Sequence, residues 1–354
     1  MFSTPLVAAL ALALPASAQA QASASIAAGR AQASALAPSE IVAAAPAADW
    51  VAIAPSDLLV MTLAPDAAGK PRQVVIQLMP PPFSQGWIDN IRKLAAAHWW
   101  DGTSINRVHD NYVVQWGDAN AEEKAKAKAL PEGLQKMPEN AYVSTNGELT
   151  AELVKTMSKA QLRQLQESPQ TTTTYQARSQ VDGLLKSDAY AFRTLFNAGW
   201  PLAQGGGVPD SRVWPVHCYG MVGVGRDLSP DTGSGAELYT VIGHAPRHLD
   251  RNIALVGRVI EGIEHLSSLP RGTLPLGFYD VAKGEQRVPI VSIRLATELP
   301  AADQPKFEYL ATESASFARY ADARANRHDP FFIVPAGGAD ICNIPVPVSR
   351  VTKP

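Results

Sequence analysis

Cysteine is nearly absent from the sequence, which has only Cys218 and Cys342 among its 354 residues. Two cysteines are too few for a disulfide-dense scaffold or for the cysteine clusters that hold structural zinc. The seven histidines include no His-Glu-x-x-His pattern, which places two zinc ligands on one face of a helix. We therefore expect no metal centre.

Charge of either sign is also in short supply. Lysine and arginine number 31, aspartate and glutamate number 33, and the formal net charge is −2. The chain has no basic cluster of the kind that follows a phosphate backbone, so we expect no nucleic-acid partner. The glycines of 223–225 and 233–235 are not followed by the Gly-Lys-Ser/Thr of a phosphate loop, and they predict surface loops instead.

Long apolar runs are missing beyond the first residues. The opening sequence MFSTPLVAALALALPASAQA has an apolar run shorter than the ~20 residues that span a bilayer, and it ends at the Ala-x-Ala spacing of a signal peptidase site. We interpret residues 1–22 as a signal peptide, cleaved after Ala20 or Ala22. A membrane anchor or an apolar N-terminal helix is the alternative. A cleaved signal predicts a periplasmic or secreted protein without stable membrane insertion.

Export bears on the two cysteines, because an oxidising compartment allows them to pair. A disulfide between Cys218 and Cys342 is one prediction, and two buried small apolar side chains are the other. Apart from the adjacent His217, nothing in the sequence around either thiol favours a reactive thiolate. Thiol catalysis is therefore not expected.

Composition divides the remainder of the chain. Residues 23–48 are dominated by alanine and predict a flexible or partly helical lead-in. A main domain covers 49–300, and a C-terminal extension that packs on it covers 301–354. Within the main domain, 119–204 has a more charged and threonine-rich texture, with helical patterns at 148–166 and 179–197. This part predicts an inserted, partly helical segment.

Strand patterns dominate the main domain outside the insertion. Alternating or β-branched runs bounded by turns predict eight strands, at 57–63, 73–78, 104–108, 112–118, 218–224, 236–242, 253–259 and 289–295. Apolar residues at helical spacing predict helices at 85–99 and 262–268. There is no repeat and no alternation of strands with helices. We therefore predict a mainly β fold, a closed eight-stranded antiparallel barrel capped by two helices.

Four segments in this order resemble one protein family. The most specific is 100–108 (WDGTSINRV) with 112–118 (YVVQWGD), which is similar to the Tyr-Asp-Gly-Thr-x-Phe-His-Arg-Val and Phe-Met-Ile-Gln-Gly-Gly-Asp of cyclophilins. The other three are 74–78 (VVIQL), 88–94 (IDNIRKL) and 248–262 (HLDRNIALVGRVIEG), which resemble the family's second strand, its following helix and its Leu-Asp-Gly-Lys-His motif. The resemblance runs from Leu58 to about Leu295 and implies a cyclophilin-like barrel with peptidyl-prolyl cis-trans isomerase activity.

The chemistry that this resemblance implies needs no cofactor. Rotation about an X-Pro bond breaks amide resonance across a barrier of ~18–20 kcal/mol, and a donor aimed at the prolyl nitrogen stabilises the twisted amide. By resemblance, Arg107 is this catalytic residue, since arginine stays charged and presents a rigid fork of donors. Tyr112 and Val113 line the proline pocket and Gln115 orients the arginine. Without Arg107 and Gln115 beside them, Tyr112 and Val113 would be assigned to plain barrel core.

The opposite wall of the pocket departs further from the family. By position, the remaining substrate-binding residues are Val222, Gly223, Val224, Glu237, Tyr239, His248, Leu249 and Ile253. The family has asparagine at the position of Gly223, glutamine at that of Glu237 and histidine at that of Ile253. These departures bear on substrate range and rate more than on fold.

We predict a monomeric peptidyl-prolyl cis-trans isomerase that acts on proline-containing polypeptides among exported proteins. The departures at Gly223, Glu237 and Ile253 motivate an alternative, a noncatalytic peptide-binding or chaperone module on the same barrel. A secreted hydrolase built on the insertion is a third possibility. It lacks a convincing nucleophile, because no Gly-x-Ser-x-Gly motif accompanies His109-Asp110.

Overall fold

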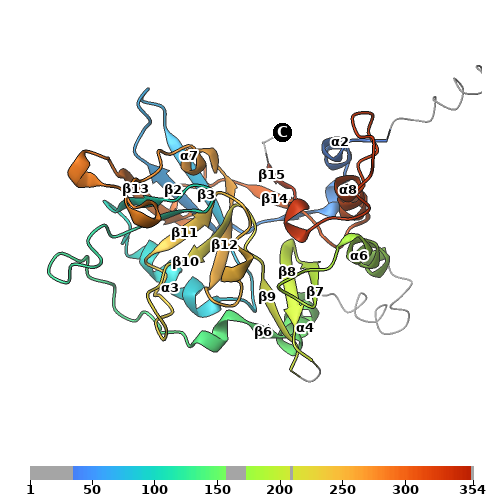
Figure 1. The fold of residues 1–354 in the computed structure, drawn as a ribbon, viewed down its shortest axis with the longest axis horizontal. Coiled ribbons are helices and arrows are strands. Elements are labelled where there is room, and N and C mark those ends of the chain that lie inside the picture. The colour runs from blue at the N-terminus through green and yellow to red at the C-terminus, as the bar shows by residue number, and fades with distance from the viewer. Residues whose placement is uncertain (1–34, 157–172, 208–209, 352–354) are drawn as a thin grey trace, which may run out of the picture.

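The computed structural model describes residues 35–156, 173–207 and 210–351. Figure 1 shows a β-barrel lobe beside a second lobe of strands and helices. The expected signal peptide, the first part of the alanine-rich lead-in and the end of the predicted helix 148–166 lie outside the described residues. Within the described ranges, no helix combines the length and the apolar character needed to cross a membrane.

The barrel is closed by eight antiparallel strands, and this confirms the predicted fold class. Around the barrel the strands follow the order β10-β11-β5-β4-β13-β2-β3-β12, and β12 pairs with β10 to complete the circle. Each overlaps one predicted strand. Their bounds are β2 Leu58–Leu63, β3 Arg72–Leu78, β4 Ser104–Val108, β5 Val113–Gly117, β10 Met221–Val224, β11 Leu238–Val241, β12 Leu255–Glu261 and β13 Val288–Leu295.

Side-chain alternation divides β2 and β3 between two cores. Because successive side chains of a strand point to opposite faces, Leu59 and Met61 of β2 enter the barrel core, whereas Leu58 and Val60 pack outside it. The outer cluster includes Phe307 of the C-terminal extension. Both faces of these strands are thus covered, which explains why β2 is almost entirely apolar.

The predicted helix 85–99 is α3 (Gln85–Ala96), and the predicted 262–268 is the shorter α7 (Glu264–Ser267). Trp87, Ile91 and Leu94 of α3 are fully buried in the main core. The indole nitrogen of Trp87 donates to the carbonyl oxygens of Thr232 and Gly233 at 3.1 and 3.0 Å. These bonds tie α3 to the loop before β11.

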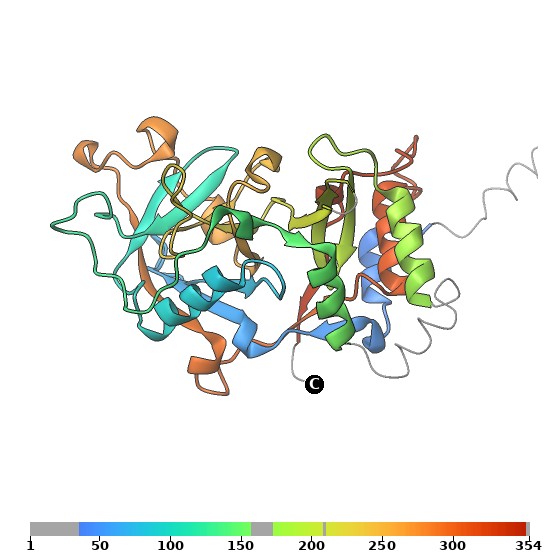
Figure 2. The same ribbon diagram turned by 90° about the horizontal axis from the view of Figure 1, so that it is seen from below.

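The second lobe is built on a four-stranded antiparallel sheet in the order β6-β9-β8-β7. Helices α2, α6 and α8 lie together at the end farthest from the barrel, as Figure 2 shows. The core cluster is continuous between the two lobes. The bounds are β6 Ser144–Thr145, β7 Arg193–Asn197, β8 Trp200–Gly205, β9 Arg212–Pro215, α2 Pro38–Ala43, α4 Asn146–Thr156, α6 Thr173–Leu184 and α8 Ala315–Ala325.

The helix predicted for 179–197 is wrong after Leu184, where α6 ends and a strand hairpin follows. Ala198 and Gly199 turn the chain between β7 and β8 with φ values of 48° and 81°. Positive φ at both central residues is the geometry of a tight hairpin turn. The sheet then continues to Pro215, beyond the expected end of the insertion at 204. In the lead-in, Ile41 of α2 is buried in the core, so this part is an ordered helix.

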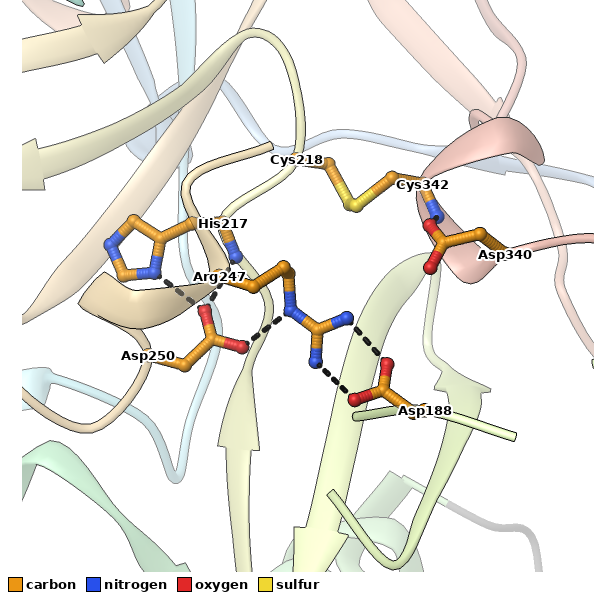
Figure 3. The surroundings of a disulfide bond; sticks show 7 residues. All are labelled: Asp188, His217, Cys218, Arg247, Asp250, Asp340 and Cys342. Carbon is orange, nitrogen blue, oxygen red and sulfur yellow. Dashed lines mark hydrogen bonds and ion pairs between the residues drawn. A yellow bond between two sulfur atoms is a disulfide. The ribbon is translucent and has the colours of Figure 1, made fainter. Parts of the chain in front are cut away.

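The C-terminal extension contacts both lobes. Strand β14 (Phe307–Leu310) pairs with β1 (Trp50–Ala52) and β15 (Val348–Arg350) beside the barrel, and α8 belongs to the second lobe. A disulfide joins Cys342 of the extension to Cys218, which precedes β10 (Figure 3). The extension is therefore bonded covalently to the segment that leads into the barrel.

Candidate active site

Arg107 and Gln115 face each other across the β4–β5 hairpin. A register shift between Ile105 and Arg107 places the arginine directly opposite Gln115. Arg107 Nη1 donates to Gln115 Oε1 at 3.1 Å, and Arg107 Nε donates to the carbonyl oxygen of Leu276 at 2.6 Å. The third contact is between Arg107 Nη2 and His109 Nδ1 at 3.2 Å. The guanidinium is thus fixed from three sides.

Two aromatic rings flank the same guanidinium. Arg107 Cζ lies 5.7 Å from the ring centroid of Tyr112 and 5.5 Å from that of Phe278. Burial lowers the pKa of Arg107, yet an arginine stays protonated at neutral pH. Phe278 and His109 are site residues that the sequence did not indicate. Phe278 belongs to a loop without a strand pattern, and it reaches the site through an isolated bridge to Arg107.

An apolar cluster on the outer face of the barrel lies next to the arginine. It is separate from the barrel core, and its members are Tyr112, Val113, Tyr239, Val241, Leu249 and Ile253. His248 adds a stacking contact with Tyr112, with ring centroids 6.2 Å apart and planes at 18°. The structure therefore brings the predicted pocket residues 112, 113, 239, 248, 249 and 253 together. Val241 is an addition that follows from alternation along β11.

The β10 residues divide between the two faces of the barrel wall. Val222 and Val224 are buried in the interior core, so only their backbone remains available to a substrate on the outer face. Gly223 faces outward and pairs with Tyr239 across β10 and β11. A Cβ atom on Gly223 would lie 2.3 Å from Tyr239 Oη. Glycine is thus the residue that lets the tyrosine ring lie across this strand.

Glu237 lies next to Gln115 and does not belong to the apolar cluster. Its Oε1 is buried and has no hydrogen-bond partner among the described residues. Burial raises the pKa of Glu237 to about 7, while hydrogen bonds from Gln115 and from the backbone at Asp118 act in the opposite direction. The position assigned to the pocket wall therefore holds a carboxyl group that is hydrogen-bonded to Gln115.

His217 contacts the pocket residue Tyr239 and was not predicted as a site residue from the sequence. Its Nε2 lies 3.0 Å from Tyr239 Oη, although 22 residues separate the two in the chain. The sequence signal was confined to its place beside Cys218. Together, these contacts make a site on the outer face of the barrel. It has a fixed cation at Arg107, an adjacent apolar cluster and a tyrosine, Tyr239, whose hydroxyl contacts His217.

Comparisons with known proteins bear on the family and the fold. A family model described as cyclophilin type peptidyl-prolyl cis-trans isomerase/CLD matches residues 86–295, which is more than half of the chain. The crystal structure of cyclophilin AquaCyp293 from Hirschia baltica is similar at a TM-score of 0.57 and 19% identity, covering 85% of this chain and 93% of that one. Because this coverage exceeds that of the family model, the shared fold extends beyond the barrel.

A second solved structure is a cyclophilin type peptidyl-prolyl cis-trans isomerase of Cryptosporidium parvum, crystallised in the presence of the dipeptide Ala-Pro. Its TM-score is 0.33 at 9% identity, covering 67% of this chain and 98% of that one. Comparison with curated protein sequences gives no match.

Proposed function

Because the chain belongs to the cyclophilin-type peptidyl-prolyl cis-trans isomerase family, we propose that it isomerises X-Pro bonds at the outer-face site, with Arg107 as the catalytic residue. The observation that carries this assignment is the position of the Arg107 guanidinium beside the apolar cluster of Tyr112, Val113 and Tyr239. A proline ring bound in that cluster has its nitrogen within reach of a fixed cationic donor.

The reaction makes and breaks no covalent bond. As the amide twists, resonance is lost and the lone pair localises on the prolyl nitrogen. A hydrogen bond donated to that lone pair exists only in the twisted state, so it lowers the barrier without tightening ground-state binding. Arginine has five N–H groups, and three contacts hold Arg107 in place. Donors remain for the substrate.

The partners of Arg107 prevent it from following the substrate as the peptide turns. Gln115 and the Leu276 carbonyl fix the plane of the guanidinium, and the rings of Tyr112 and Phe278 limit its rotation. Donors that are fixed before the reaction need no reorganisation at the transition state, which is the source of electrostatic catalysis. The site thus stabilises the twisted peptide selectively.

We place this activity in an exported protein of the periplasm or the medium, with proline-containing exported polypeptides as substrates. The disulfide between Cys218 and Cys342 supports this location, because disulfides persist in oxidising compartments. The short apolar run at residues 6–14 and the small residues after it support the same location.

A protease-coupled assay on the peptide Ala-Ala-Pro-Phe tests the assignment of Arg107. We expect Arg107→Ala to lower kcat/KM by roughly 10²- to 10³-fold, the usual effect of removing one transition-state donor. Arg92→Ala is the matched control, since Arg92 on α3 pairs with Asp57 away from the site, and it should keep the wild-type rate. Equal rates for wild type and Arg107→Ala would exclude Arg107 as the catalyst. A wild type that binds the peptide without accelerating its isomerisation would instead identify a noncatalytic peptide-binding module.

A further inference from the structure

A buried chain of polar side chains leads from the second lobe to the back of the proline pocket. It begins at Asp188, between α6 and β7, and passes through Arg247 to Asp250 (Figure 3). From Asp250 it continues to His217 and ends at Tyr239. Between 1% and 6% of the side chains of Asp188, His217, Arg247 and Asp250 is exposed, and 5% of Tyr239 is exposed.

The hydrogen bonds in this chain have a defined direction. Asp250 Oδ2 accepts from Arg247 Nε at 2.7 Å, and Asp250 Oδ1 accepts from the backbone N–H of His217 at 3.0 Å. Burial acts to raise the pKa of Asp250, but His217 and Arg247 outweigh it and lower this pKa. Asp250 is therefore a carboxylate, which only accepts hydrogen bonds.

The carboxylate sets the tautomer of the histidine. His217 Nδ1 lies 2.9 Å from Asp250 Oδ1, so Nδ1 carries a proton and donates it to the carboxylate. In the neutral imidazole the other nitrogen is then an acceptor. When the imidazole is neutral, the Tyr239 hydroxyl, 3.0 Å from His217 Nε2, donates to the histidine. The direction of the Tyr239 hydroxyl is set by His217, whose ring is in turn held by Asp250.

The glycine at 223 makes room for this arrangement. A Cβ at Gly223 would lie 2.3 Å from Tyr239 Oη and 2.4 Å from Tyr239 Cζ, closer than van der Waals contact allows. The tyrosine ring thus occupies the volume of a side chain at 223. Its apolar edge remains in the pocket cluster with Val113 and Ile253, while its hydroxyl points to His217.

We propose that His217 is a positioning residue of the isomerase, which fixes the Tyr239 ring as a wall of the proline pocket, and that the Asp188–Arg247–Asp250 chain makes this wall depend on the second lobe. This inference rests on the proposed function, because it assigns Tyr239 to the proline pocket. It predicts that changes in the second lobe alter substrate positioning through one defined ring. The disulfide between Cys218, the neighbour of His217, and Cys342 attaches the C-terminal extension to the chain beside His217.

A double-mutant cycle separates positioning from a general structural role. His217→Ala leaves the Tyr239 hydroxyl buried without a partner and frees its ring. We expect this variant to lower kcat/KM for Ala-Ala-Pro-Phe about tenfold, since small displacements of a positioned group cost rate steeply. Tyr239→Phe keeps the ring but removes the hydroxyl. In that background, His217→Ala should change the rate by less than about twofold, because the residue has lost the group through which it acts.

Substitution of Asp188 tests the link to the second lobe. Asp188→Asn keeps a hydrogen-bond acceptor for Arg247 but removes the charge. We expect it to lower kcat/KM about threefold in the wild type and to have little effect beside Tyr239→Phe. The matched control is Asp340→Asn. Asp340 lies beside the disulfide and does not belong to the Asp188–Arg247–Asp250 series of side chains. Its carboxylate accepts from the Cys342 backbone N–H at 2.8 Å, so this variant should keep the wild-type rate.

The results that would overturn the inference differ from those that would overturn the proposed function. If His217→Ala lowers the rate equally with tyrosine or phenylalanine at 239, the residue supports the fold and does not position the ring. An unchanged rate in His217→Ala excludes the role altogether. The proposed function fails separately, when the wild type gives no acceleration. In that case the affinity of each variant for the same peptide tests the pocket wall. His217→Ala should weaken peptide binding with tyrosine at 239 and have little effect with phenylalanine at 239.

Discussion

Replacing Glu237 with glutamine tests the protonation of a carboxyl group that lies next to Gln115, the hydrogen-bond partner of Arg107. Glu237 is a partly buried carboxyl group whose Oε1 has no partner in the described part of the chain. Burial raises its pKa from 4.5 to about 7, and the nearby carboxylates of Asp118 and Glu122 act in the same direction. Glutamine has almost the same shape and no charge. The variant therefore removes the cost of ionisation and little else.

The sign and size of the effect follow from the two pKa values. Between pH 4.5 and about 7, the folded protein retains a proton that the unfolded chain has released, so the stability of the wild type falls as pH rises through this window. One pKa unit corresponds to ~1.4 kcal/mol, which gives about 3 kcal/mol for the full shift. Water at the partly exposed carboxyl group reduces this to about 2–3 kcal/mol.

Urea unfolding of both proteins across this pH range is the assay. Glu237→Gln should match the wild type near pH 4 and exceed its free energy of unfolding by about 2–3 kcal/mol near pH 8. Glu285→Gln is a contrasting control. Hydrogen bonds from Thr273 and the Asp280 backbone lower the pKa of Glu285, so that variant should lose stability relative to the wild type as pH rises. A difference between Glu237→Gln and wild type that does not change with pH would refute the reasoning.

Two further predictions concern the connection between the lobes. The disulfide closes a loop across 124 residues, so Cys218→Ser with Cys342→Ser should lower the free energy of unfolding by roughly 4–5 kcal/mol; an unchanged urea midpoint would contradict this. Arg258 of β12 is buried, donates to the Gly199 carbonyl at 2.7 Å and lies 4.5 Å from the Trp200 ring. Arg258→Ala leaves the buried Gly199 carbonyl without its donor and should destabilise the protein by roughly 1–3 kcal/mol in the same experiment. An unchanged urea midpoint would show that the lobes do not depend on this contact.

Local sequence patterns predicted the barrel because each strand has its own signal. The apolar and β-branched residues of 58–63 and 74–76 favour strands, and the side chains of β2 and β3 are covered on both faces. Strands β4 and β5 are neighbours in the sequence and pair as a hairpin. A register shift in this hairpin places Arg107 opposite Gln115. The half of the site that lies on this hairpin was predicted through its resemblance to the cyclophilin motif, because strand patterns alone would leave Arg107 a surface cation.

The second lobe was harder to predict because its signals are not local. The apolar spacing over 179–197 fits a helix, yet the turn at Ala198 and Gly199 and the strands after it make β7 part of a sheet. Pairing of β7 with β8 outweighs the helical preference of that segment. The same limit applies to Phe278, which enters the site from a loop through tertiary contact with Arg107.

The departures from the family pattern have a different meaning once the side chains are placed. Taken singly, glycine at 223 is a lost asparagine and tyrosine at 239 an ordinary aromatic replacement. In space they depend on each other, because the Tyr239 hydroxyl fills the volume that a side chain at 223 would need, and that hydroxyl in turn requires the acceptor of His217. Tyr239 would clash with a larger side chain at 223, and without His217 its buried hydroxyl would be unpaired, which costs ~1–3 kcal/mol. The residues at 217, 223 and 239 therefore depend on one another in this wall of the pocket. Their difference from the cyclophilin pattern is no argument that catalysis is lost.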